Sequence, residues 1–136
     1  LQDSLNRAKF LLAFSTSVSP APYTHPTKEY ITGRWTDALA SGVTVVGKVP
    51  NTTTVREILW DGATIDIDHA DARAGLAQVA DAVSRWTPAQ GEQQIRQALQ
   101  HLDWRHRFVQ LCEAMGEVPT SLTADCEAMR AQYVQR

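Results

Sequence analysis

Two short apolar runs, joined by a proline-rich polar segment, constrain the fold of this chain more than any other feature. The runs cover residues 10–14 and 43–49, and three of the six prolines lie between Pro20 and Pro26. Proline lacks a backbone N–H donor and biases the preceding residue toward extended geometry, so the segment around it cannot be a helix. The pattern predicts a long binding loop, within residues 15–42, between a strand and a short helix.

Short runs rich in β-branched residues alternate with segments that carry turn and cap residues. Strands are predicted at residues 9–14, 43–49 and 63–67, because such runs fit strands buried on both faces of a parallel sheet. Helices are predicted between them at 34–41 and at 54–60, the second opened by a capping box. This order predicts an α/β fold, a three-stranded parallel βαβαβ half of a doubly wound domain.

Only helices are predicted after the third strand, and a short one, residues 1–8, before the first. The later helices begin after residues 68–71, at Thr87, at Asp103 and at Pro119, where side chains suit a cap or a first helical turn. Apolar residues recur along each at helical spacing and are expected to face the core. In chain order these faces are Leu76, Val79, Ala80 and Val83; Ile95, Ala98, Leu99 and Leu102; Trp104, Phe108, Leu111, Cys112 and Met115; and Leu122, Cys126, Met129 and Tyr133.

Size and composition favour one ordinary globular unit. The chain has 136 residues, 43% hydrophobic and 21% charged, with a formal net charge of −2. This balance gives no electrostatic argument for a nucleic-acid or membrane-surface partner, and no apolar run approaches the roughly 20 residues that span a bilayer. Cys112 and Cys126 lack metal-ligand spacing and are expected to be buried free thiols, which favours the cytoplasm.

The start of the sequence and the position of the predicted first strand bear on what this chain can do alone. The sequence starts at Leu1 rather than at methionine, so we expect residues 1–136 to be part of a longer protein. The strand containing Phe10–Phe14 is then expected to lie at an uncharged, apolar edge of the sheet. Such an edge favours self-association, or pairing with segments from outside this sequence.

Two acidic residues are the first candidates for a binding site. Glu29 precedes Asp37 with seven residues between them, which spans the end of the loop and the start of the next helix. Ionised carboxylates accept several hydrogen bonds and therefore suit the paired hydroxyl groups of a sugar or a ribose. Two solvated surface acids would explain the same pattern equally well.

Other residues of the loop could bind an anion or a ring. Thr32, Gly33 and Arg34 open a helix, where free backbone N–H groups and a guanidinium can hold a phosphate. An ordinary turn and cap would also explain them. Tyr23 and His25 could contact a sugar or a base, although a loop histidine more often contacts backbone. The histidines and cysteines show no shared metal spacing, and no serine-hydrolase elbow is present.

Three segments, in this order, resemble motifs of the group-1 glycosyltransferases of GT-B fold. Residues 34–46 read RWTDALASGVTVV and resemble the family's "fEAlAaGtpvv" segment. Residues 57–64 read EILWDGAT and resemble "elf-pGe", and residues 102–108 read LDWRHRF and resemble "htWehRf". Glu29 and Asp37 match the family's pair of glutamates at this separation, with aspartate in the second place.

The resemblance implies a partial C-terminal, nucleotide-sugar-binding domain with a helical tail, Rossmann-like and metal-independent, with no cofactor. It implies that Glu29 contacts the donor sugar, that Asp37 contacts the ribose, and that the loop and helix start hold the diphosphate. Transfer to the unknown acceptor would then require the intact protein, so the 136-residue chain should be inactive alone. The alternative is a non-catalytic sugar-nucleotide or protein-binding α/β module.

Overall fold

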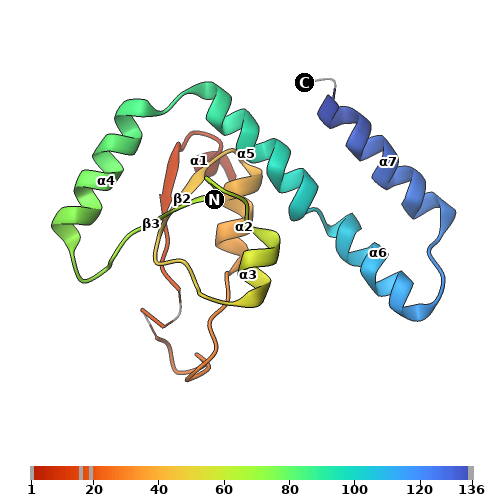
Figure 1. The fold of residues 1–136 in the computed structure, drawn as a ribbon, viewed down its shortest axis with the longest axis horizontal. Helices are drawn as coiled ribbons and strands as arrows, with labels where there is room; N and C mark the ends of the chain where they lie inside the picture. Colours follow the sequence, from red (N-terminus) through yellow and green to blue (C-terminus); the bar gives the residue numbers. More distant parts are fainter. Residues whose placement is uncertain (1, 16, 19, 135–136) are drawn as a thin grey trace.

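The computed structural model describes residues 2–15, 17–18 and 20–134 as a small sheet with helices around it (Figure 1). The elements follow one another along the chain as α1 (Gln2–Leu5), β1 (Phe10–Leu12), α2 (Gly33–Ala40), β2 (Thr44–Gly47), α3 (Thr53–Ile58), β3 (Thr64–Asp66), α4 (Ala72–Arg85), α5 (Pro88–His101), α6 (Trp104–Met115) and α7 (Thr120–Val134). The predicted order of three strands and their helices is confirmed.

The sheet is parallel, with the strands in the order β1-β2-β3. In the register of the sheet, Leu11 pairs with Val45, and Val46 pairs with Ile65. The predicted mixed α/β fold with a three-stranded parallel sheet is therefore confirmed. The carboxyl ends of all three strands lie along one edge, from which the loops after β1 and β2 emerge.

One face of the sheet carries the hydrophobic core. Side chains from β1 and β2 pack there against α1, α2 and α5, and Trp35 of α2 is only 1% exposed. The fully or largely buried members are Leu5, Ala13, Trp35, Ala38, Leu39, Val43, Val45, Ala63 and Ala98. Gly42 ends α2 with a φ of 82°, and a side chain there would press on the backbone of Gly91 in α5. Glycine thus allows both the left-handed turn and the close approach of α2 to α5.

The opposite face of the sheet is only partly covered. An apolar groove of about 360 Å³ runs between alternate residues of β1 and helix α4, with Phe10, Phe14 and Val46 in its lining. Leu76 of α4 also lines it and is 71% exposed. The expectation that Leu76, Val79, Ala80 and Val83 face the core is wrong for most of this set, since only Val79 is half-buried.

Helices α6 and α7 form a hairpin that extends away from the sheet (Figure 1). Cys126 and Met129 of α7 are buried, as predicted, and Leu122 is half-buried. The predicted inward face of α6 is wrong, because Trp104, Phe108, Leu111 and Met115 are exposed and Cys112 is half-buried. Tyr133 lies among side chains outside the described set.

Two further local expectations are corrected. Helix α3 is capped by Thr52, whose hydroxyl accepts a hydrogen bond from the Val55 N–H at 3.3 Å, and not by Thr54. Three successive threonines offer the same cap chemistry, so the sequence could not select one. In α5, Ala98 is buried but Ile95 is exposed, because the helix turns Gln94 toward the sheet.

The predicted first strand lies at the edge of the sheet. β1 pairs with β2 on one side, and Leu12 is 61% exposed. Its neighbours Phe10 and Phe14 are half-buried in the apolar groove. Self-association through this edge stays a prediction. Among the described residues, no helix combines the length and apolar character needed to cross a membrane.

Candidate functional site

The carboxyl edge of the sheet is built by a close backbone contact between the ends of β1 and β2. The N–H of Ala13 donates to the carbonyl of Val46 at 2.8 Å, and any side chain at Gly47 would collide with the Ala13 carbonyl oxygen. Glycine is therefore required at this position. The contact holds the ends of β1 and β2 together at this edge.

Glu29 returns from this loop to the end of β1. Its carboxylate oxygen Oε1 accepts a hydrogen bond from the hydroxyl of Ser15 at 2.6 Å and another from the hydroxyl of Ser17. Ser15 is 1% exposed and directly follows the apolar residues of β1. The buried hydroxyl thereby anchors the far end of the loop to the sheet.

These contacts favour the ionised form of Glu29. The hydroxyl of Ser15, followed by that of Ser17, lowers the pKa of the Glu29 carboxyl. The backbone N–H of Asn51 and the charge of Lys48, both after β2, lower this pKa further, while partial burial opposes them. A carboxylate is thus held where the segments after two parallel strands meet, the position at which ligands bind in open α/β sheets.

The other residues of the loop are more exposed. Nδ1 of His25 accepts hydrogen bonds from the N–H groups of Thr27 and Lys28, each at 3.1 Å, so this nitrogen shapes the loop. Tyr23 and Tyr30 are exposed to solvent. Among the described contacts, none joins His25 or Tyr23 to Glu29.

Helix α2 starts after the loop with open space at its N-terminus. Thr32 is the N-cap residue but makes no side-chain cap hydrogen bond, and nothing lies within 4 Å of the place of a side chain at Gly33. Arg34 is exposed, and its guanidinium has no ion pair within the described part of the chain. Anion binding at this end of α2 stays a prediction.

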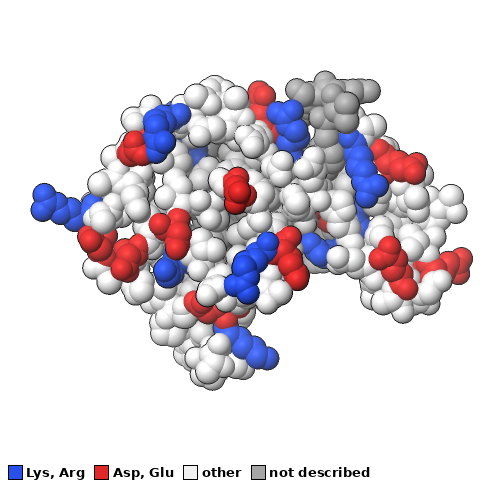
Figure 2. Space-filling model, viewed as in Figure 1, with Lys and Arg blue, Asp and Glu red and all other residues white. Residues whose placement is uncertain are grey.

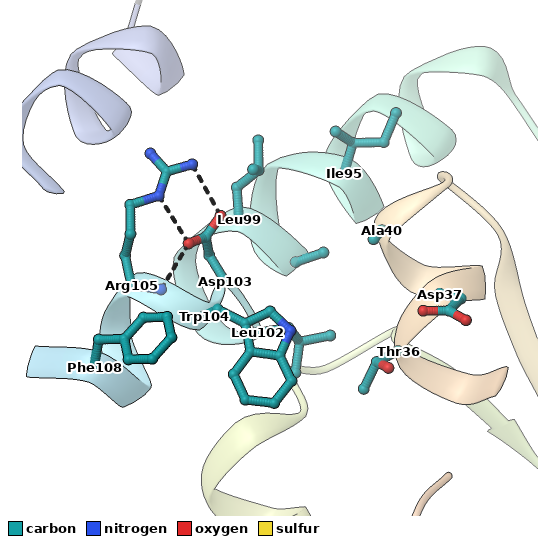
Figure 3. A pocket seen from close by; sticks show the side chains of 11 residues that line it. Thr36, Asp37, Ala40, Ile95, Leu99, Leu102, Asp103, Trp104, Arg105 and Phe108 are labelled. Atoms are coloured by element: carbon teal, nitrogen blue, oxygen red, sulfur yellow. Dashed lines mark hydrogen bonds and ion pairs between the residues drawn. The ribbon is translucent and has the colours of Figure 1, made fainter. Parts of the chain in front are cut away.

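Asp37 lies further along α2, on the wall of a different cavity (Figure 3). This cavity, of about 480 Å³, lies between α2, α5 and the first turns of α6, and Glu29 does not line it. The structure therefore places the two predicted carboxylates in different surroundings. Their joint action on one donor molecule stays a prediction from the resemblance.

Charged side chains of both signs are interspersed on the face of the molecule drawn in Figure 2. Within residues 2–15, 17–18 and 20–134, no group of three or more His, Cys, Asp or Glu side chains is arranged to hold a metal ion. At the carboxyl edge, the Glu29 carboxylate can accept hydrogen bonds, and the start of α2 near Arg34 presents N–H groups and a guanidinium of the kind that bind anions.

Two sets of polar contacts, one at the site and one in the core, were missed in the sequence. Ser15 and Ser17 orient Glu29, and the one pattern that could indicate them is a polar residue directly after a buried strand. Gln94 is buried and accepts from the indole N–H of Trp60 at 2.8 Å. It donates to the hydroxyl of Thr44 at 3.1 Å and to the carbonyl of Gly62 at 2.6 Å, and so fastens α5 to the sheet.

Comparisons of the chain with models of known families, with curated proteins and with solved structures found no match.

Proposed function

We propose that this chain is the donor-binding part of a glycosyltransferase of GT-B fold, which transfers a sugar from a nucleotide diphosphate sugar to an acceptor. One observation carries the proposal: the ionised Glu29 carboxylate lies at the carboxyl edge of a parallel βαβαβ sheet. Ser15 and Ser17 engage its Oε1 atom. A carboxylate has about four acceptor positions, so capacity remains for sugar hydroxyl groups.

The start of α2 supplies a second part of a donor site. Glu29 precedes α2 by a few residues, and Arg34 extends from its first turn without an ion pair among the described residues. A diphosphate at this N-terminus would meet free N–H groups, the positive end of the helix dipole and a guanidinium. Sugar and diphosphate would thus bind on the two sides of the short segment 30–33.

Nucleotide binding by the 136-residue chain tests the proposal. The melting temperature is measured with uridine or guanosine diphosphate and with their glucose or mannose derivatives. A ligand at a hundred times its Kd should stabilise the fold by about 2.7 kcal/mol, a shift of roughly 10 °C. No shift with any of these ligands would contradict the proposal.

Glu29→Gln makes the test specific. The amide keeps an oxygen for Ser15 and Ser17 but loses the charge, so a nucleotide sugar should bind about tenfold more weakly while the bare diphosphate binds as before. Glu57→Gln, at an exposed position of α3, is the matched control and should change neither affinity. Equal weakening of sugar and diphosphate by Glu29→Gln would place Glu29 elsewhere in the site.

Arg34→Ala tests the proposed binding of the diphosphate at the start of α2. Loss of a charge-assisted contact should weaken all nucleotide diphosphates by roughly 1.5–3 kcal/mol, about tenfold or more. Isothermal titration that gives the same affinity for Arg34→Ala and wild type would exclude Arg34 from the site. Arg73→Ala, at an exposed position in α4, controls for the loss of one surface charge.

A further inference from the structure

The cavity that contains Asp37 has one wall of exposed aromatic side chains (Figure 3). Trp104 and Phe108, one turn apart on α6, are 74% and 51% exposed, with ring centroids 6.3 Å apart and planes tilted by 37°. Leu99 of α5 and Leu102, which directly follows that helix, contribute apolar surface beside them. The cavity therefore presents an apolar and aromatic surface large enough for a small organic molecule.

The charges of the cavity leave one acid without a partner. The Asp103 carboxylate receives the backbone N–H of Arg105 at 2.9 Å, its Nε at 2.9 Å and its Nη2 at 3.2 Å. This ion pair is satisfied internally and its charges cancel. Asp37, on the α2 side, makes no side-chain hydrogen bond or ion pair among the residues the structure describes.

The exposed aromatic rings and the unpaired carboxylate of Asp37 together favour a positively charged ligand. Aromatic ring faces attract cations, and an unpaired carboxylate does so more strongly. An anion would meet the net negative charge left by Asp37. A sugar would bring many hydroxyl groups that need hydrogen-bond partners. The hydroxyl of Thr36 cannot donate to them, because it already donates to the carbonyl of Gly33 at 3.0 Å. Few polar groups thus remain to satisfy a carbohydrate.

We propose that this cavity binds a small organic ammonium ion with an aromatic or aliphatic body. The ammonium group pairs with the carboxylate of Asp37, and the apolar body packs on Trp104, Phe108 and the two leucines beside them. Glu29 and Arg34 of the proposed donor site do not line this cavity. The ammonium site takes Asp37 in place of the ribose contact that the resemblance implies for it.

A matched pair of probes tests the proposal on the whole chain. Phenethylamine and phenethyl alcohol share a body and differ in the ammonium group. Each is titrated while the indole N–H resonance of Trp104, assigned with Trp104→Phe, is followed by NMR. We expect saturable binding of the amine, at least about tenfold tighter than the alcohol.

Three variants locate the site. Asp37→Asn should abolish the preference for the amine, whereas Asp61→Asn, at an exposed position outside the cavity, should retain it. Trp104→Ala should weaken the binding of both probes several-fold. Because Trp104 is exposed, the variant should stay folded, which circular dichroism checks. Equal affinity of wild type for the two probes, no saturable binding of the amine, or an unchanged preference in Asp37→Asn would each overturn the proposal.

Discussion

The two faces of the sheet differ in how completely helices cover them. On one face, α2 and α5 pack closely enough to leave Trp35 at 1% exposure, and Gln94 fastens α5 to the strands. On the other, an apolar groove remains between β1 and α4, and Leu76 of α4 is 71% exposed. Both faces are apolar in sequence, so apolar character alone does not indicate which helix is anchored.

The largest expected difference is between a large side chain on the covered face and one on the open face. Trp35→Ala should lower the free energy of unfolding by about 3–5 kcal/mol, because it removes a buried aromatic side chain and leaves a cavity. Leu76→Ala should change it by no more than about 0.5 kcal/mol. Urea unfolding followed by circular dichroism measures both.

A large decrease in the free energy of unfolding for Leu76→Ala would contradict this comparison. It would mean that the α4 face is covered in solution by another molecule. Repeating the measurement over a range of protein concentrations would then show whether that molecule is a second copy, because stability would rise with concentration.

The next effect concerns the polar anchor of the covered face. Gln94→Leu should lower the free energy of unfolding by roughly 1–3 kcal/mol, because the Trp60 indole N–H and the Gly62 carbonyl lose their partner. Gln93→Leu, one residue earlier and exposed, should have an effect within about 0.5 kcal/mol. Equal effects of these two substitutions in urea unfolding would show that Gln94 does not anchor α5.

At the carboxyl edge of the sheet, substitution of Glu29 should have a smaller effect on the free energy of unfolding, and this effect should depend on pH. The Glu29 carboxyl has a lowered pKa in the fold, so its contribution to stability is present above its ordinary pKa. This contribution is lost as the pH falls through the lowered folded-state value. At neutral pH, the free energy of unfolding of wild type should be higher than that of Glu29→Gln by on the order of 1 kcal/mol. This difference should vanish in strong acid. Urea unfolding across this pH range gives the difference, and a constant difference would contradict the assignment.

The smallest effect on stability is expected at the open edge of β1. Leu12→Lys replaces an exposed residue and should change the free energy of unfolding by no more than about 0.5 kcal/mol. A charge on the edge should nevertheless oppose strand pairing between chains. Sedimentation equilibrium should detect self-association of wild type and less of it in Leu12→Lys. A wild type that stays monomeric at high concentration would contradict the predicted association.

Some features of the site followed from the sequence and others did not. The loop and the start of α2 near Gly33 were predicted, because prolines and glycine act within a few residues of their own position. The hydroxyl groups that hold Glu29 were not predicted, because Ser15 lies fourteen residues away and only the folded loop brings the two together. The divergence of Asp37 from Glu29 has the same origin, since α5 and α6 form the cavity around Asp37.

By itself, the sequence determined the order of strands and helices, because β-branched runs, caps and proline act through local backbone geometry. It also determined which face of each helix is apolar. Only the tertiary structure decided which of those faces is buried: α2 is covered, while much of the apolar surface of α4 and α6 remains exposed. Burial depends on what distant segments place opposite a helix, and hydrophobic periodicity carries no information about that partner.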